Sequence, residues 1–348
     1  MIKPKQQLPQ EVVTKTTFVR LIFFWLSTFI FTGLVNFGLL WYLKYFPQNE
    51  GYSRIEEKWQ LMLNLSEPVD VLILGDSSCH QGVDPSIIEA DLNVKALNLC
   101  TIADALVVNS AWMLDKYIEK HGAPKAVVLV YVYDVWHRDL NWNVMSQIPL
   151  SWGFWHNLDP EIEISFDAQW NLFLDRYVPL YSKDQSIKHI FANPHDWFQK
   201  ESRDEIEEYG SASEANPKYV EENTEAHFEF VEENKFKLSE SNRLALEKII
   251  SLANDEDFDV YLVNSPLYEG LYKNDNFRDY LQDLQITLDS YERENDRVYY
   301  LFREPRKFAD NQMENADHVI ESAAEIFSHE LAEDINKIRE TREREKRN

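Results

Sequence analysis

Short apolar runs and longer amphipathic stretches alternate over most of the chain. The short runs predict β-strands, which lie at 69–74, 94–99, 126–132, 259–264 and 298–302. The amphipathic stretches predict helices, which lie at 55–65, 87–91, 103–121, 239–253, 276–291 and 320–338. This alternation is typical of an α/β fold with a doubly wound, five-stranded parallel sheet of the flavodoxin-like kind.

One apolar stretch near the N-terminus is much longer than these strands. Residues 18–43 carry Arg20 as their one charge, and at about 1.5 Å per residue the uncharged part, 21–43, reaches roughly 35 Å. Trp25 and Trp41 lie near its two ends, as interface anchors often do. We therefore expect a transmembrane helix over 18–43. A buried helix of a soluble protein and a cleaved signal peptide are the alternatives, but the stretch exceeds a typical signal-peptide core and no Ala-x-Ala site follows it.

Basic residues are more frequent at the start of this stretch than after it. Lys3, Lys5, Lys15 and Arg20 lie on the N-terminal side, and Lys44 follows closely on the other. The positive-inside rule then predicts a cytoplasmic N-terminus and a periplasmic or otherwise extracytoplasmic main domain. An inverted anchor with an intracellular domain is the alternative. The expected order is a cytoplasmic segment 1–17, the transmembrane helix 18–43, a connector 44–68, the main domain 69–336 and a charged tail 337–348.

Between the third and fourth predicted strands, residues 134–240 break the alternation. The part up to residue 200 is rich in aromatic residues, and residues 201–240 are strongly acidic. We expect an insertion here. Its aromatic part suits a packed lid, contact with the membrane or stacking on sugar rings, although any one tryptophan taken singly suits core packing. The acidic part is typical of a solvated surface or a mobile loop.

The net charge and the absence of several common motifs exclude some classes of ligand. The formal net charge of −25 argues against binding nucleic acid or an anionic lipid surface by general electrostatics. The sequence has no Cys-x-x-Cys pair, His-Glu-x-x-His motif, Gly-x-x-x-x-Gly-Lys-Ser/Thr loop or Gly-x-Gly-x-x-Gly motif, so we expect no metal and no cofactor. The two cysteines, Cys79 and Cys100, follow neighbouring predicted strands, and outside the cytoplasm they form either a disulfide or two buried thiols.

A small polar segment, Gly75-Asp76-Ser77-Ser78, directly follows the first predicted strand. In open α/β sheets the loops at the carboxyl ends of the strands bind ligands, and glycine permits a sharp turn. Ser77 is therefore a candidate nucleophile if a base lies nearby, and a plain turn is the alternative. His318, just before the last predicted helix, is the candidate base, because the loops after the first and fifth strands can open on the same edge.

The segments around these two residues resemble the SGNH (GDSL-like) hydrolase family. The run Val71–Ser77 resembles the family's nucleophile block, and Asp317–Ala324 resembles its final block, where members often have Asp-x-x-His. Ala96–Cys100 and Val260–Pro266 add further likenesses. With its N-terminal anchor the chain is most similar to the membrane-anchored branch, which includes alginate O-acetyltransferases and relatives that act on cell-envelope polymers.

The resemblance implies an acyl-transfer reaction. Ser77 would be the nucleophile, His318 its general base, and the Ser77 N–H one oxyanion donor. A covalent acyl-Ser77 would pass its acyl group to a hydroxyl of an envelope or exported polysaccharide, or to water. Members of this branch often work beside a membrane-bound O-acyltransferase that delivers the acyl group. The resemblance thus implies a membrane-anchored O-acetyltransferase or esterase.

The acid that usually supports the family's histidine has no plain counterpart here. It lies two or three residues before the histidine, where this chain has Ala316 and Asn315, while Asp317 is adjacent to His318. The third family block, Gly-x-Asn-Asp, corresponds to Tyr131-Val132-Tyr133-Asp134. Asp317, Asn315 and Asp134 are therefore the candidate supports of His318.

The oxyanion site also departs from the family pattern. Its second-block glycine corresponds to Cys100 or Thr101, and Asp76 stands beside the nucleophile. Losing one oxyanion donor typically costs about a hundred- to a thousandfold in rate. The alternative function is therefore a catalytically inactive SGNH-like protein that binds glycan or scaffolds a membrane complex.

Overall fold

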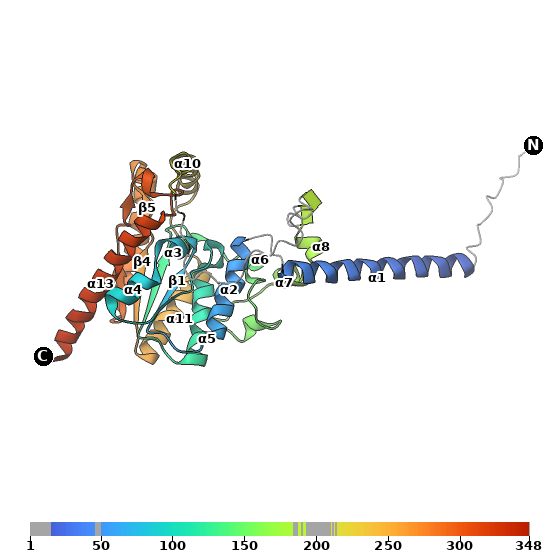
Figure 1. Cartoon of the computed structure of the whole chain (residues 1–348), viewed down its shortest axis with the longest axis horizontal. Helices are drawn as coiled ribbons and strands as arrows, with labels where there is room; N and C mark the ends of the chain where they lie inside the picture. Colours follow the sequence, from blue (N-terminus) through green and yellow to red (C-terminus); the bar gives the residue numbers. More distant parts are fainter. Residues whose placement is uncertain are drawn as a thin grey trace, which may run out of the picture. The chain divides into compact units, whose positions relative to one another are not determined.

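The computed structural model describes residues 15–45, 50–183, 187–188, 191–192, 210, 212 and 214–347. Internal contacts divide the chain into two units (Figure 1). The smaller unit comprises the described residues of Met1–Gln48 and Phe173–Glu201, and the larger those of Asn49–Leu172 and Ser202–Asn348. The larger unit contains all the strands of the described residues.

The five predicted strands alternate with helices along the chain, and two further short strands, β5 and β7, which the sequence did not predict, form a separate two-stranded sheet. The strands of the described chain are β1 (Val71–Gly75), β2 (Ala96–Asn98), β3 (Ala126–Tyr131), β4 (Asp259–Asn264), β5 (Leu267–Tyr268), β6 (Val298–Leu301) and β7 (Lys307–Phe308). The α-helices are α1 (Lys15–Tyr45), α2 (Glu50–Asn64), α3 (Ser77–Gly82), α4 (Pro85–Leu92), α5 (Leu106–His121), α6 (Trp142–Met145), α7 (Phe166–Tyr177), α8 (Pro179–Ser182), α10 (Pro217–Glu233), α11 (Glu240–Glu256), α12 (Asp275–Glu294) and α13 (Glu321–Arg347).

The five predicted strands form one parallel sheet in the order β2-β1-β3-β4-β6, which confirms the α/β class and the five-stranded parallel sheet. Chain order reverses between β1 and β3, because β1 leads to β2 on one side and β3 leads to β4 on the other. The loops after β1 and β3 therefore diverge. Such a switch point leaves a crevice at the carboxyl ends of the strands, where open α/β sheets bind their ligands.

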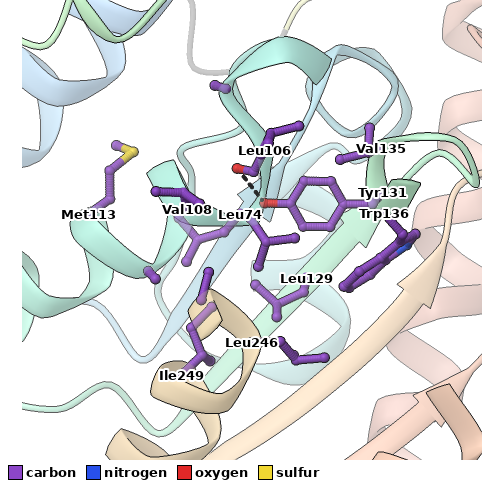
Figure 2. Close-up of a cluster of buried hydrophobic side chains, with 14 of the residues drawn as sticks. Leu74, Leu106, Val108, Met113, Leu129, Tyr131, Val135, Trp136, Leu246 and Ile249 are labelled. Atoms are coloured by element: carbon purple, nitrogen blue, oxygen red, sulfur yellow. Dashed lines mark hydrogen bonds between the residues drawn. The ribbon is translucent and has the colours of Figure 1, made fainter. Parts of the chain in front are cut away.

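Alternate side chains of the strands pack into two separate apolar clusters. Leu72, Leu74 and Leu129 lie in one cluster with residues of α2, α5, α11 and α12. Val71 and Ile73 lie in the other with residues of α3, α4 and α13. Figure 2 shows part of the first cluster, and in Figure 1 α4 and α13 lie on the opposite side of the strands from α5 and α11. Burial on both faces explains why these strands are nearly continuously apolar.

Capping residues explain where two of the helices begin or end. The carboxylate of Asp84 accepts a hydrogen bond from Ser86 N, and Pro85 supplies a preset φ angle at the first position of α4. α5 ends at Gly122, whose φ of +80° suits glycine and whose N–H donates to Ile118 O.

The helix α2 belongs to the larger unit, although its residues fall within the expected connector 44–68. Ile55, Trp59 and Met62 are buried in the first cluster. The indole N–H of Trp59 donates to Asn109 Oδ1 on α5 at 2.9 Å. This helix therefore contributes to the hydrophobic core of the domain.

The segment expected as an insertion, 134–240, has more regular structure than the sequence suggested. Part of the acidic stretch forms the helix α10, which buries Val220 and Val231 and leaves its glutamates exposed. For 217–233 the expected solvated surface is therefore present on a helix, and the alternative of a mobile loop is wrong. Of the tryptophans of the aromatic part, Trp136 and Trp155 are buried and Trp152 and Trp170 exposed. Residues 201–209 and Trp197 lie outside the described residues.

The smaller unit contains α1. Within it, Thr17–Leu43 is long and apolar enough to cross a membrane, and its side chains are largely exposed. The amide Nδ2 of Asn36 donates to the carbonyl oxygen of Tyr177 at 2.8 Å, so this polar group in the apolar stretch has a partner within the same unit.

Gly75 lies at the crowded end of β1, which makes it a sensitive test of the sheet. An added Cβ would collide with Val130 O and lie 2.7 Å from Cys79 Cβ. We expect Gly75→Ala to lower the free energy of unfolding by at least about 3 kcal/mol, because overpacking costs about 1–3 kcal/mol even where side chains can move. Gly82→Ala, whose Cβ would be 3.7 Å from its nearest neighbours, is the control and should change it by less than about 1 kcal/mol. Urea unfolding measures both, and equal losses would contradict this packing.

Candidate active site

The buried carboxylate of Asp76 organises the turn after β1. Its Oδ1 accepts hydrogen bonds from Ser78 N at 2.9 Å, Ser78 Oγ at 2.5 Å and Cys79 N at 3.2 Å, which caps α3. Its Oδ2 accepts from Val132 N at 2.8 Å, just after β3. Burial raises the pKa of Asp76, while these hydrogen bonds oppose that rise. One side chain thus joins the loops on the two sides of the switch point.

The two serines after Asp76 have different environments. Ser78 is buried, donates to Asp76 and accepts a hydrogen bond from Ser265 Oγ at 2.6 Å. Ser77 is half-buried, and within the described chain its hydroxyl makes no hydrogen bond. Of these two serines, Ser77 is therefore the one whose hydroxyl is free within the described chain.

Cys79 and Cys100 form a disulfide, with Cα atoms 5.8 Å apart. Of the two states that the sequence allowed, the structure has the bonded one. The bond ties α3 to the loop after β2, so it fixes the helix that starts with Ser77 to a second strand end.

The ring of His318 is held on its Nδ1 side. Asn315 Oδ1 accepts backbone hydrogen bonds from Asp317 N at 3.0 Å and His318 N at 2.9 Å, so this atom is the amide oxygen rather than the nitrogen. The same oxygen lies 3.0 Å from His318 Nδ1, and Asp317 Oδ1 also lies 3.0 Å from it. Two acceptors around Nδ1 place the proton of the neutral ring there, and they leave Nε2 as the basic atom.

Asp317 and His318 are coupled electrostatically. Burial alone would raise the pKa of Asp317, but His318, His227 and Arg138 outweigh it and hold this pKa below its usual value. Burial alone would lower the pKa of His318, but the charge and hydrogen bond of Asp317 outweigh it and raise this pKa, with smaller contributions from Asp76 and Glu314. The folded protein thus favours the ionised pair.

The helix α3 packs against the segment that carries His318. Gln81 Nε2 donates to Glu314 Oε2 at 2.8 Å, and Gly82 packs against Val319. Within the described residues no hydrogen bond joins Ser77 to His318. The structure therefore brings the two segments to one edge without forming the hydrogen bond of an assembled Ser–His pair, which in free enzymes often tightens only with substrate.

The predicted oxyanion donors differ in availability. The N–H of Cys100 donates to Asn98 Oδ1 at 3.0 Å, and the N–H of Thr101 donates to Gly75 O at 2.9 Å. The N–H of Ser77, in the first turn of α3, has no acceptor within the described chain. Of these three N–H groups, that of Ser77 is therefore the one that is free to donate a hydrogen bond to a bound oxygen atom.

Asp134 does not support His318 in this structure. Its Oδ2 pairs with the guanidinium of Arg138, which also binds Asp104 Oδ1 at 2.8 Å. Arg138 has a raised pKa: burial opposes the rise, and Asp134 and Asp104 outweigh it. Of the three candidate supports, the structure places Asn315 and Asp317 at the ring.

Sequence reasoning missed a second histidine at this site. His227, on α10, lies with its Nε2 3.9 Å from Asp317 Oδ1 and its Nδ1 2.7 Å from Tyr133 OH. A lone histidine in an acidic stretch carries no sequence signal, because only the packing of α10 brings it here. Among the described residues, no group of three or more His, Cys, Asp or Glu side chains has an arrangement that could hold a metal ion.

The raised pKa of His318 predicts a pH dependence for any reaction that uses it as a base. The rate of Ser77 labelling by a fluorophosphonate probe should rise with pH through an inflection above about 6.5, the ordinary histidine value, because His318 must be neutral. Asp317→Asn should move this inflection to lower pH. Glu314→Gln, which removes a weaker influence, should move it less. An inflection in Asp317→Asn at or above that of the unsubstituted protein would contradict the assignment.

The same shift predicts a linked change in stability. Because the folded pKa of His318 is raised, its contribution to stability is complete below about pH 6.5 and is lost as the pH rises through the folded pKa. His318→Gln should therefore flatten the fall in the free energy of unfolding above about pH 6.5. Urea titrations across that range measure it, and an unchanged slope would show that the pair is not coupled to folding.

The disulfide gives a further prediction for stability. Cys79 and Cys100 are 21 positions apart, and closing a loop of that size stabilises a fold by about 3 kcal/mol in the chain-entropy description. A Cys79→Ser/Cys100→Ser double variant should lose roughly that much free energy of unfolding. A reducing agent should destabilise the unsubstituted protein and leave the double variant unaffected. Equal sensitivity of both proteins to reductant would argue against the bond.

Neither comparison with known proteins identifies a relative. No protein-family model matches the chain, and no curated protein matches it.

Proposed function

We propose that this chain is a membrane-anchored, SGNH-like serine acyltransferase or esterase that modifies an envelope or exported polysaccharide. The observation that carries the proposal is the arrangement of His318. Asn315 and Asp317 hold its Nδ1, Nε2 makes no hydrogen bond within the described chain, and the segment packs against α3, which begins with the free hydroxyl of Ser77. A nucleophile, a base and an orienting acceptor are the parts that acyl transfer needs.

The reaction follows from these parts. His318 Nε2 takes the Ser77 proton as Oγ attacks the acyl carbonyl, and the Ser77 N–H donates to the oxygen that becomes negative. The carbon–oxygen bond to the leaving group breaks, and the leaving oxygen takes the proton from His318. An acceptor hydroxyl, or water, then gives its proton to Nε2 and attacks the acyl carbon of acyl-Ser77. The bond between that carbon and Oγ breaks, the acyl group leaves on the acceptor oxygen, and Oγ takes the proton back from Nε2.

The anchor and the disulfide support the proposed location. Thr17–Leu43 suits a membrane span, and the excess of lysine and arginine on its N-terminal side favours a cytoplasmic N-terminus. The disulfide Cys79–Cys100 suits an oxidising compartment for the main domain. An acyl-Ser77 site outside the cytoplasm needs an acyl donor there, and a membrane-bound O-acyltransferase is the partner that this arrangement suits.

A second candidate function is a catalytically inactive SGNH-like protein that binds glycan or scaffolds a membrane complex. Two observations favour it. No hydrogen bond joins Ser77 to His318 among the described residues, and the N–H groups of Cys100 and Thr101 already have acceptors.

Labelling of the detergent-solubilised full chain with a fluorophosphonate probe separates the two functions. We expect the unsubstituted protein to be labelled, and Ser77→Ala and His318→Ala to abolish labelling. Ser78→Ala is the matched control, because Ser78 is buried and engaged, and this variant should keep its labelling while losing about 1 kcal/mol of stability. No labelling of the folded unsubstituted protein would overturn the catalytic proposal in favour of the binding one.

A further inference from the structure

The helix α10 attaches to the segment that carries His318. Asn216 N donates to Met313 O at 3.1 Å, and Asn223 Oδ1 accepts from Ala316 N at 3.0 Å. One turn further along α10, His227 is largely buried, with 11% of its side chain exposed, and lies against Asp317. Two side chains of this helix therefore meet residues next to the candidate base.

These contacts fix the proton position on His227. Because Asn223 Oδ1 accepts from Ala316 N, it also accepts from His227 Nε2, 3.2 Å away, and Nε2 must carry a proton. In the neutral ring Nδ1 is then an acceptor, and Tyr133 OH donates to it at 2.7 Å. The Nε2–H lies at the same time 3.9 Å from Asp317 Oδ1, the oxygen that contacts His318 Nδ1.

We propose that His227 is a positioning residue for Asp317, and through it for His318; this inference rests on the proposed function of Ser77 and His318. The Nε2–H of His227 donates to Asn223 Oδ1, which also holds Ala316 N, and from 3.9 Å it attracts the carboxylate of Asp317 electrostatically toward the side where it meets His318 Nδ1. Tyr133 in turn holds the His227 ring from the loop after β3. The site is complete only when α10 is docked, which makes the acidic stretch part of the site.

The direction in which the pKa of His318 changes when His227 is substituted distinguishes a positioning role of His227 from a simple effect of its charge. Charged and titratable groups face His318 from its own segment (Asp317, Glu314), from the β1–α3 side (Asp76, His80) and, through Asp317, from α10 (His227). Burial lowers the pKa of His318, and Asp317 outweighs burial. If the loss of His227 lets the carboxylate of Asp317 turn away from His318, the effect of burial becomes dominant and the pKa of His318 falls. If His227 acts only as a nearby positive charge, removing it raises the pKa of His318.

The test compares His227→Phe, which keeps a ring without a donor, with His227→Gln, whose Nε2 amide can donate from a similar place. The full chain, labelled with ¹³C at histidine Cε1 and held in detergent, is titrated by NMR, and His318→Gln assigns the His318 signal. We expect His227→Phe to lower the pKa of His318 by about half a unit or more, and His227→Gln to restore it. Tyr133→Phe, which removes one hydroxyl, should lower it by a smaller amount and covers the case in which His227→Phe does not fold.

Fluorophosphonate labelling supplies the second readout. His227→Phe should be labelled about tenfold more slowly, since a misoriented base loses part of the roughly 10²–10⁴-fold that general-base catalysis contributes. His227→Gln should stay near the unsubstituted rate. An unchanged or raised pKa of His318 in folded His227→Phe, or a failure of His227→Gln to restore it, would overturn the proposal. The titration needs no turnover, so it tests His227 even if the unsubstituted protein is not labelled and the proposed function fails.

Discussion

The buried carboxylate of Asp76 is the interaction on which the rest of the site depends. It accepts from the first turn of α3 and from Val132 after β3, so a single charge joins the two loops that diverge at the switch point of the sheet. Such a charge is stable away from water only when hydrogen bonds satisfy it. Satisfying Asp76 fixes the start of α3, and the start of α3 fixes Ser77 with a free N–H and a free hydroxyl. The disulfide from Cys79 then holds this helix to the neighbouring strand end.

The other half of the site is built by a tight turn rather than by a long-range acid. Asn315 folds back on the N–H groups of Asp317 and His318, and this turn presents both the amide oxygen and the Asp317 carboxylate to His318 Nδ1. In the proposed function a neutral acceptor and an adjacent carboxylate would together orient the base. The raised pKa of His318 is the expected consequence of that carboxylate. Helix α10 meets the turn from outside through Asn223 and His227.

The five-stranded sheet could be predicted because β1 to β4 are buried along almost their whole length and therefore appear as short apolar runs, while β6 is still apolar or aromatic although its alternate residues are only partly buried. The edge that carries Ser77 could be predicted as well, since Gly75 ends such a run. The contribution of α10 could not be predicted, because Val220 and Val231 are its two buried positions among many glutamates. The helix reaches the site through contacts with residues far away in the sequence, such as Ala316, 93 positions from Asn223. Asn315 and Asp317 were candidates by position alone. Which atom each presents to His318 depends on a backbone turn that residue spacing does not specify.

In the proposed reaction Ser77 forms a covalent acyl intermediate with the help of His318. The most direct measurement is peptide mass spectrometry of the full chain after incubation with an activated acetyl ester and rapid acid quenching. We expect an acetyl group on the peptide that contains Ser77, with none on that peptide in Ser77→Ala or His318→Ala. An acetyl group that persists in folded Ser77→Ala at the same peptide, or its absence from the folded unsubstituted protein, would contradict the account.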